Sequence, residues 1–161
     1  MDLTELGATI RRARIQSGIS QVDLARMSDL SRATVNSAER GRLAIGADAL
    51  LRLMQPLGLG IGGPKEEDQN ATRLMAKSAS VSLRIKLPVA VLELAFVTGE
   101  VADRWLPHFS IIIDEATDAM LLRTVREVAD RFDTPAPVIW RNLKRIAATL
   151  LSPNPRWRHG D

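Results

Sequence analysis

The sequence predicts a mostly α-helical protein of two domains that contains one short β-strand. Three observations support this fold class. Apolar residues recur at helical spacing over most of the 161-residue chain. The stretch GLGIGGPKEEDQNATR at 58–73 interrupts that spacing with glycines, a proline and charges, as linkers do. The stretch SVSLRIKLP at 80–88 alternates apolar and polar side chains, as a half-buried strand does. We therefore expect a first domain over 1–63, a linker over 64–78 and a second domain over 79–161.

The segment SQVDLARMSDLSRATVNSAERG, residues 20–41, predicts two short helices joined by a tight turn. Ser20 and Asp23 have the spacing of a capping box, so a helix begins near residue 21. Asp29 tolerates a left-handed backbone, which places the turn there. Ser31 can cap a second helix, and Gly41 suits the left-handed end of that helix.

A tight turn forces its two helices to cross closely, and the crossing point needs a small side chain. Ala25 supplies one. The polar start of the second helix is then left facing outward. This geometry is the helix-turn-helix, in which the N-terminal residues of the second helix enter the major groove of DNA.

The flanking residues extend the motif to a domain. Helical apolar spacing precedes it at Leu3, Leu6, Ile10 and Ala13 and follows it at Ala47, Leu50, Leu51, Leu53, Met54 and Leu57. Residues 3–60 resemble the XRE, or Cro/C1-type, helix-turn-helix domain of phage repressors and bacterial regulators. The resemblance rests on LGATIRRARIQSGISQVDLA, LSRATVNSAERGR and ADALLRLMQPLGL. It covers a little over a third of the chain and implies a lambda-repressor-like fold.

The resemblance also implies roles for individual residues. Base edges would be read by Arg32, Ala33, Thr34 and Ser37. Phosphates would be contacted by Gln21, Ser31, Arg40 and Arg42, and Gln21 would also support the recognition helix. An internal ion pair would join Arg14 to Glu39. The sequence departs from the family at Asp29, where glycine is preferred, and after Leu59, where a fifth helix often follows and supports dimer contacts.

The chemistry of these side chains agrees with those roles. Arginine donates two parallel hydrogen bonds to O6 and N7 of guanine, so Arg32 is the best candidate for reading sequence. Ala33 and Thr34 suit contact with a thymine methyl group. Contacts of Arg40 and Arg42 with phosphates would add affinity but little selectivity.

Composition limits the kinds of site and the cellular location that we expect, but it does not decide the function. The net charge is only +3, so affinity for DNA requires a local basic patch. The chain has no cysteine, which excludes disulfides and thiolate metal sites. It lacks an apolar run of membrane-spanning length and the order of a signal peptide, so we expect a cytoplasmic protein that does not bind membranes.

The alternating stretch predicts a strand whose buried side chains are Val81, Leu83 and Ile85. A single strand cannot form a sheet, so we expect it to pair with its own copy across a homodimer. Ribbon-helix-helix proteins read DNA with such a ribbon, which would place Arg84 and Lys86 toward the bases. The helices that follow do not match that family well.

Four helices are expected after the strand, over 89–97, 101–113, 119–132 and 136–151. Their core would contain Leu121, Leu122, Val125, Ile139, Leu143, Ile146, Leu150 and Leu151. Within residues 119–151, Val128, Ala129, Asp133 and Ile139 repeat the spacing of Leu24, Ala25, Asp29 and Val35. This repeat leaves open a second helix-turn-helix that exposes Trp140, Arg141, Lys144 and Arg145. Against it, Val125, Thr134 and Asn142 replace Gln21, Leu30 and Ala38, so a dimerisation or partner-binding domain is the preferred interpretation.

The sequence offers little for catalysis. His108 and His159 are its only histidines, and they do not have metal-ligand spacing. His108 lies between apolar residues and is expected to pack in a partly buried position, whereas Asp114, Glu115 and Asp118 suit a solvated helix junction. No phosphate-binding glycine loop or nucleophile motif is present. We expect neither enzymatic activity nor a cofactor or metal ion.

Together these features predict a sequence-specific regulator of transcription, most simply a repressor. It would bind double-stranded DNA as a homodimer on an operator with two half-sites. An alternative is an antitoxin-type protein, whose second domain neutralises a partner such as a toxin while the helix-turn-helix regulates its own gene.

Overall fold

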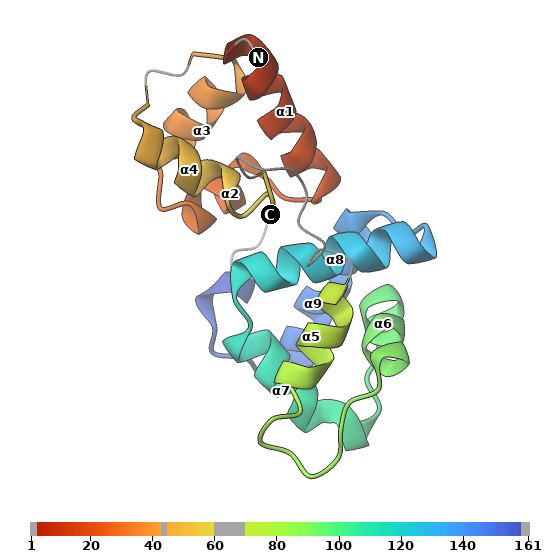
Figure 1. Cartoon of the computed structure of the whole chain (residues 1–161). Coiled ribbons are helices and arrows are strands. Elements are labelled where there is room, and N and C mark those ends of the chain that lie inside the picture. The colour runs from red at the N-terminus through yellow and green to blue at the C-terminus, as the bar shows by residue number, and fades with distance from the viewer. Residues whose placement is uncertain (1–2, 43–44, 60–69, 159–161) are drawn as a thin grey trace. The chain divides into compact units, whose positions relative to one another are not determined.

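The computed structural model describes residues 3–42, 45–59 and 70–158. The chain forms two compact units, Met1–Glu67 and Asp68–Asp161 (Figure 1). Helices dominate both units. In the described parts of the chain, none of these helices is both long and apolar enough to cross a membrane.

The first unit contains helices α1 to α4, with bounds Leu3–Gln16, Gln21–Met27, Arg32–Glu39 and Ala47–Met54. Both α1 and α2 pack against α3. The core is formed by apolar side chains that are at most 7% exposed, namely Ile10, Ala13, Ile19, Leu24, Ala25, Val35, Ala38, Leu53 and Leu57. The fifth helix of the XRE family would follow Leu59, where residues 60–69 lie outside the described residues.

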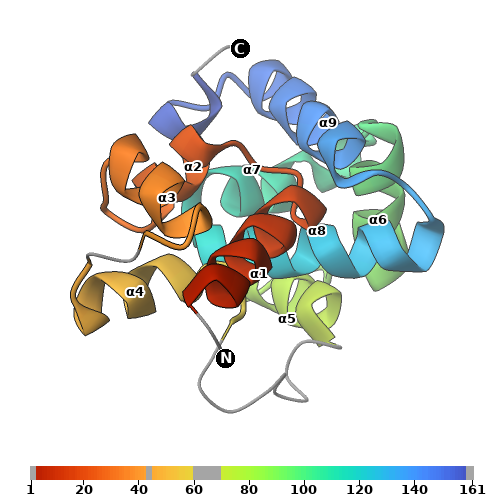
Figure 2. The ribbon, with the colours of Figure 1, turned by 90° about the horizontal axis from the view of Figure 1, so that it is seen from above.

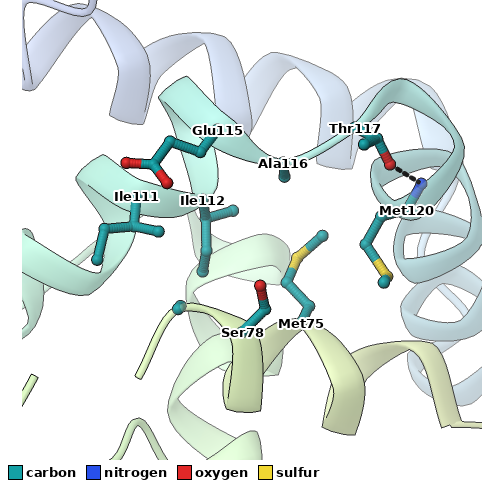
Figure 3. Close-up of a pocket in the computed structure, with 9 residues that line it drawn as sticks. Met75, Ser78, Ile111, Ile112, Glu115, Ala116, Thr117 and Met120 are labelled. Carbon is teal, nitrogen blue, oxygen red and sulfur yellow. Dashed lines mark hydrogen bonds between the residues drawn. The ribbon is translucent and has the colours of Figure 1, made fainter. Parts of the chain in front are cut away.

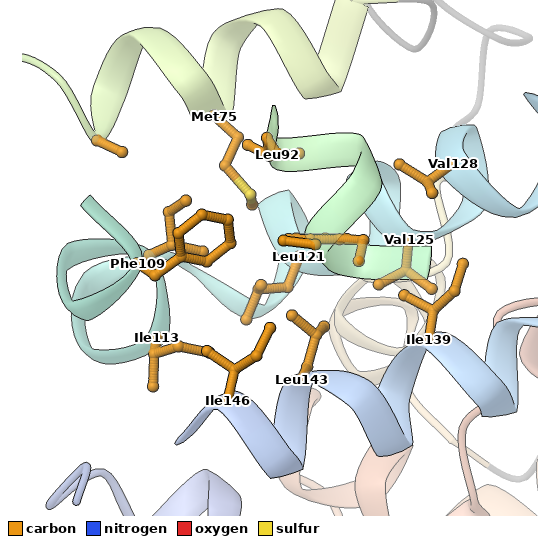
Figure 4. Close-up of a cluster of buried hydrophobic side chains, with 14 of the residues drawn as sticks. Met75, Leu92, Phe109, Ile113, Leu121, Val125, Val128, Ile139, Leu143 and Ile146 are labelled. Carbon is orange, nitrogen blue, oxygen red and sulfur yellow. The ribbon is translucent and has the colours of Figure 1, made fainter. Parts of the chain in front are cut away.

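The second unit contains helices α5 to α9, with bounds Ala71–Ser78, Val89–Thr98, Leu106–Glu115, Asp118–Phe132 and Ala136–Thr149. Short 3₁₀ helices, η2 and η3, cover Asp103–Trp105 and Pro155–Trp157. Figure 4 shows side chains from all five α-helices meeting in one core, including Met75, Leu92, Phe109, Leu121 and Leu143. Most of the expected core residues lie in or against it. Leu151 does not, because it is 86% exposed.

The contact between α6 and α9 closes an exposed helix end. The two helices lie side by side (Figure 2). Asn142 of α9 donates to the carbonyl oxygens of Phe96 and Val97, at 3.0 and 2.7 Å, and Arg145 donates to that of Thr98 at 2.7 Å. The last carbonyls of a helix have no partner within it, so these bonds replace water at the end of α6.

The expected linker over 64–78 is wrong in its second half, because α5 begins at Ala71 and belongs to the second unit. Its buried residues Thr72 and Met75 face α8 and the core. Glu127 of α8 accepts hydrogen bonds from the amide and the hydroxyl of Thr72, at 3.1 and 2.7 Å. Eight residues that follow a charged run give too short a periodic pattern to stand out in the sequence.

The strand expected at Val81, Leu83 and Ile85 is not formed; in the second unit as described, these residues lie in turns and bends. Ser80 holds the segment, because its hydroxyl donates to Ala76 O and accepts from the amide of Leu87. Val81 and Ile85 are 79% and 57% exposed. The alternating pattern therefore reflects a surface segment that is anchored at its start and end.

His108 anchors the same segment. It is buried, and its Nε2 lies 2.6 Å from the carbonyl oxygen of Ile85. Its ring also meets that of Trp105 edge to face. The single helix expected over 101–113 is instead η2 followed by α7, which starts at Leu106 with Pro107 in its first turn. Proline suits a first turn because its missing N–H has no acceptor there.

Candidate nucleic-acid interface

The turn between α2 and α3 sets the angle at which α3 is presented. Asp29 is left-handed, with φ of +52°. The amide of Leu30 donates to the carbonyl of Ala25 at 2.9 Å, which closes the end of α2. Ala25 is 5% exposed at the contact between the helices. A larger side chain there would push the two helices apart, so a small residue is required.

The start of α3 is fixed by Ser31, whose hydroxyl oxygen accepts from the amide of Thr34 at 3.0 Å. The hydroxyls of Ser31 and Thr34 also bond to each other at 2.8 Å. Both expected DNA-contacting hydroxyls are therefore engaged in the helix cap. The bond between the two hydroxyls uses only one of their two protons, so the expected contacts of Ser31 with a phosphate and of Thr34 with a base stay predictions.

Arg32 and Ala33 are exposed at the start of α3, and Arg40 and Arg42 are exposed at its end. Ser37 is half-buried, and its hydroxyl donates to the carbonyl of Arg42 at 3.2 Å. The end of the helix is closed by Gly41, with φ of +74°, and by the amide of Arg42, which donates to Ser37 O. Ser37 therefore positions the backbone of Arg42 in addition to any contact with a base.

Asn36 is a candidate that the sequence interpretation missed. It lies in α3, one helical turn after Arg32 and one turn before Arg40, which follows the last residue of the helix. Asn36 is partly exposed. An asparagine amide can bond to both N6 and N7 of adenine. The i, i+4 spacing to Arg32 was the signal that could have identified it.

Arg14 and Glu39 form the expected ion pair, which ties α1 to α3. Arg14 Nε lies 2.5 Å from Glu39 Oε1, and Arg14 Nη2 lies 3.1 Å from Oε2. Arg14 also donates to the carbonyl of Ile19 at 2.9 Å. The side chains of Arg14 and Glu39 are only 12% and 2% exposed.

Gln21 belongs to the same network, because its Nε2 donates to Glu39 Oε2 at 2.9 Å. The side chain therefore supports the helix that carries Arg32, as the resemblance implies. A glutamine amide has two N–H donors, and the bond to Glu39 uses one of them, so the contact with a phosphate stays a prediction.

The pKa of Glu39 reflects this network. Burial by itself would raise the pKa, but hydrogen bonds from Arg14 and Gln21, together with the charges of Arg14 and Arg11, lower it below the ordinary value of 4.5. Glu39 is therefore ionised at neutral pH and holds α1, α2 and α3 in register.

Gly7 allows α1 to approach the end of α3 closely. A methyl group at this position would lie 2.5 Å from the carbonyl oxygen of Ala38 and 2.7 Å from the amide nitrogen of Gly41. Both are backbone atoms, which cannot move aside as a flexible side chain can. Gly7 therefore fixes the position of α1 against the segment that leads to Arg40 and Arg42.

The second unit contains a pocket of about 190 Å³ between α5, α7 and the start of α8 (Figure 3). It is lined mostly by apolar side chains, among them Met75, Ile112 and Met120. Its polar lining residues are Ser78, Glu115 and Thr117. In the same unit, the carboxylate of Asp114 accepts a hydrogen bond from the hydroxyl of Ser152, and the backbone carbonyl of Asp114 accepts one from the side-chain amide of Asn154. Over the described residues, no group of three or more His, Cys, Asp or Glu side chains is placed to hold a metal ion.

Comparisons with known proteins agree with the geometry of the first unit. Residues 10–63 match the model of the protein family described as helix-turn-helix. No curated protein matches the chain, and no solved structure matches it. The match begins within α1 and includes α2, the turn, α3 and α4. Residues 10–63 are therefore a helix-turn-helix domain of the XRE type.

Proposed function

We propose that this protein is a transcriptional repressor that binds double-stranded DNA through α3. The family match supports a DNA-binding regulator in general. The observation that supports this surface is the exposed start of α3, which presents Arg32 and Ala33 while its buried face is fixed by Glu39. Arg32 and Asn36 would read base edges, the methyl groups of Ala33 and Thr34 would meet thymine, and Ser37 would lie beside them.

Phosphate contacts would surround this face. The side chains of Gln21 and Ser31 lie at the starts of α2 and α3 and would contact phosphates there. Arg40 and Arg42 add charge at the other end of α3. These contacts would fix the register of the helix on the duplex.

One α3 helix covers too few base pairs for selectivity, so we propose a homodimer on two half-sites about 34 Å apart. We place the dimer contact in the second unit. Its side chains Val81, Ile85, Leu94 and Leu151 are 57% to 86% exposed, whereas the exposed large apolar side chains described in the first unit, Leu3, Ile15, Val22 and Leu51, are 49% to 56% exposed. Exposed apolar surface of this kind favours association.

The same exposed apolar side chains support a second candidate function, an antitoxin-type protein whose second unit binds a partner such as a toxin. The helix-turn-helix would then regulate the gene of the pair. Co-expression with the adjacent gene distinguishes the two functions, because only this one requires a second kind of chain in the purified complex.

Arg32→Ala is expected to weaken binding to a selected operator by roughly 1–3 kcal/mol with little loss on mixed-sequence DNA. Arg40→Ala is expected to weaken both alike, because a phosphate contact carries no sequence information. The operator is first selected from a random duplex pool, and affinities are then measured by fluorescence anisotropy. Arg73→Ala, which removes an exposed arginine of α5, is the control for loss of charge. Equal losses for Arg32→Ala on both DNAs would remove it from base reading.

Light scattering on the separate units tests where the dimer forms. A fragment of residues 68–161 is expected to be dimeric, and a fragment of residues 1–67 monomeric. The second fragment must begin before Ala71, because a later start would cut α5 out of the core. A dimeric first fragment, or a monomeric second one, would assign assembly to the other half of the chain.

A further inference from the structure

The turn between α8 and α9 repeats the turn of the helix-turn-helix. Asp133 is left-handed with φ of +48°, as Asp29 is with φ of +52°. The amide of Thr134 donates to the carbonyl of Ala129 at 3.0 Å, just as the amide of Leu30 donates to that of Ala25 at 2.9 Å. The sequence repeat between these segments therefore reflects the same backbone hydrogen bond and the same left-handed residue.

The two hairpins also match beyond the turn. The second helix starts three residues after the left-handed aspartate in both cases, at Arg32 in α3 and at Ala136 in α9. Val35 and Ile139, at matching positions, are both fully buried. Thr134 and Asn142 differ from Leu30 and Ala38 of the first motif. The amide of Thr134 nevertheless makes the same backbone bond as the amide of Leu30. Asn142 is buried and bonds to the end of α6, which packs on α9 as α1 packs on α3.

The outward face of α9 is basic. Arg141 and Lys144 occupy the positions that Ser37 and Arg40 hold in α3, and both are exposed. The helix sequence APVIWRNLKRIAAT has three basic residues and no acidic one. Arg145, the third basic residue, donates to Thr98 O and so also serves the contact with α6.

The first turn of α9 differs from that of α3 in ways that disfavour base reading. Pro135 and Pro137 remove backbone donors at the helix start, and the cap has no side-chain hydrogen bond. Trp140 takes the position of Asn36, but its ring packs against that of Trp157, with centroids 6.5 Å apart. The first turn of α9 therefore has no hydrogen-bonding side chain for bases, whereas the cations Arg141 and Lys144 further along the helix can bind phosphates.

We propose that α8 and α9 form a second helix-turn-helix, which contacts the phosphates of double-stranded DNA through Arg141 and Lys144. The contact adds affinity without selecting sequence. This inference rests on the proposed DNA-binding function and extends it to the second unit.

Salt dependence of binding tests the proposal in the full-length chain. The probe is a labelled 30-bp duplex of mixed sequence, titrated between 50 and 200 mM KCl. The double variant Arg141→Gln/Lys144→Gln removes two phosphate contacts and is expected to reduce the slope of log K against log salt by about 1.8. Affinity at 50 mM KCl should fall in parallel.

Two further variants make the result specific. Arg73→Gln/Lys77→Gln removes the same charge from exposed residues of α5 and should leave the slope almost unchanged. Arg40→Gln/Arg42→Gln removes the contacts proposed for the first unit and should reduce the slope by a similar amount. Circular dichroism melting curves check that each variant folds.

The outcomes separate the two proposals. If the α9 variant behaves like the α5 variant while the Arg40/Arg42 variant loses slope, α9 does not contact DNA and only the further inference is overturned. If the Arg40/Arg42 variant also leaves binding unchanged, or the wild-type chain does not bind the duplex, the proposed function itself fails. The second site is supported if the slope of log K against log salt falls for Arg141→Gln/Lys144→Gln but not for Arg73→Gln/Lys77→Gln.

Discussion

Replacing Gly7 with alanine is expected to unfold the first unit or to destabilise it by about 3 kcal/mol or more. The new methyl group would lie 2.5 Å from Ala38 O and 2.7 Å from Gly41 N. Relief requires α1 to move away from α3, which also separates Arg14 from Glu39. Alanine favours a helix over glycine by only about 1 kcal/mol, so the clash outweighs that gain.

The tryptophans allow this effect to be measured in the full chain. All three, Trp105, Trp140 and Trp157, belong to the second unit. In a urea titration, fluorescence therefore reports the second unit, whereas circular dichroism reports the helices of both. The Gly7→Ala variant should lose an early part of the dichroism signal while its fluorescence transition stays in place.

Gly46→Ala is the matched control for Gly7→Ala. A methyl group at Gly46 meets nothing within 4 Å, so this variant should change stability by less than about 1 kcal/mol. If Gly7→Ala were as mild as this control, the close approach of α1 to α3 would be wrong.

Arg14→Leu is expected to destabilise the first unit by about 3–5 kcal/mol at neutral pH, because it leaves the carboxylate of Glu39 buried without its cation. The side chain of Glu39 is only 2% exposed, so solvent screens its charge little. The double variant Arg14→Leu/Glu39→Leu should recover most of the loss, because it buries apolar groups in place of a charge. A double variant as unstable as the single one would show that packing, not charge, is what Arg14 contributes.

The effect of Arg14→Leu also depends on pH. In the wild-type chain the folded-state pKa of Glu39 is lowered, so its stabilising contribution is complete above the unfolded value of 4.5 and is lost as pH falls through the folded pKa. Without Arg14, burial raises the pKa of Glu39, and protonation relieves the buried charge. The difference in unfolding free energy between wild type and variant should therefore shrink on acidification.

Local signals made the helix-turn-helix predictable. The residues that define the caps, the crossing point and the turn each act within a few residues of their own position. The structure shows the expected local role for Ser20 with Asp23, Ala25, Asp29, Ser31 and Gly41. The role of Gly7 was not visible, since it depends on a contact with α3 that is distant in sequence. Asn36 was overlooked even though its i, i+4 spacing to Arg32 is local and can be read from the sequence.

The second unit was harder to predict because distant contacts decide its local structure. The alternation at Val81, Leu83 and Ile85 is a real pattern, but bonds from Ser80 and His108 hold that segment in turns. Helix α5 gains its stability from the core and from Glu127 rather than from its own eight residues. The spacing of apolar residues in the sequence reports neither the core contacts nor the bonds to Glu127.

The bonds from Asn142 and Arg145 to the end of α6 have a consequence for how the second unit opens. Helix ends normally fray on their own, at little free-energy cost. Here fraying of the last turn would also break the bonds to the carbonyls of Phe96, Val97 and Thr98 and would leave the buried amide of Asn142 without these acceptors. The last turn of α6 and the middle of α9 therefore form one cooperative unit, whose backbone amides exchange with solvent together rather than one end at a time.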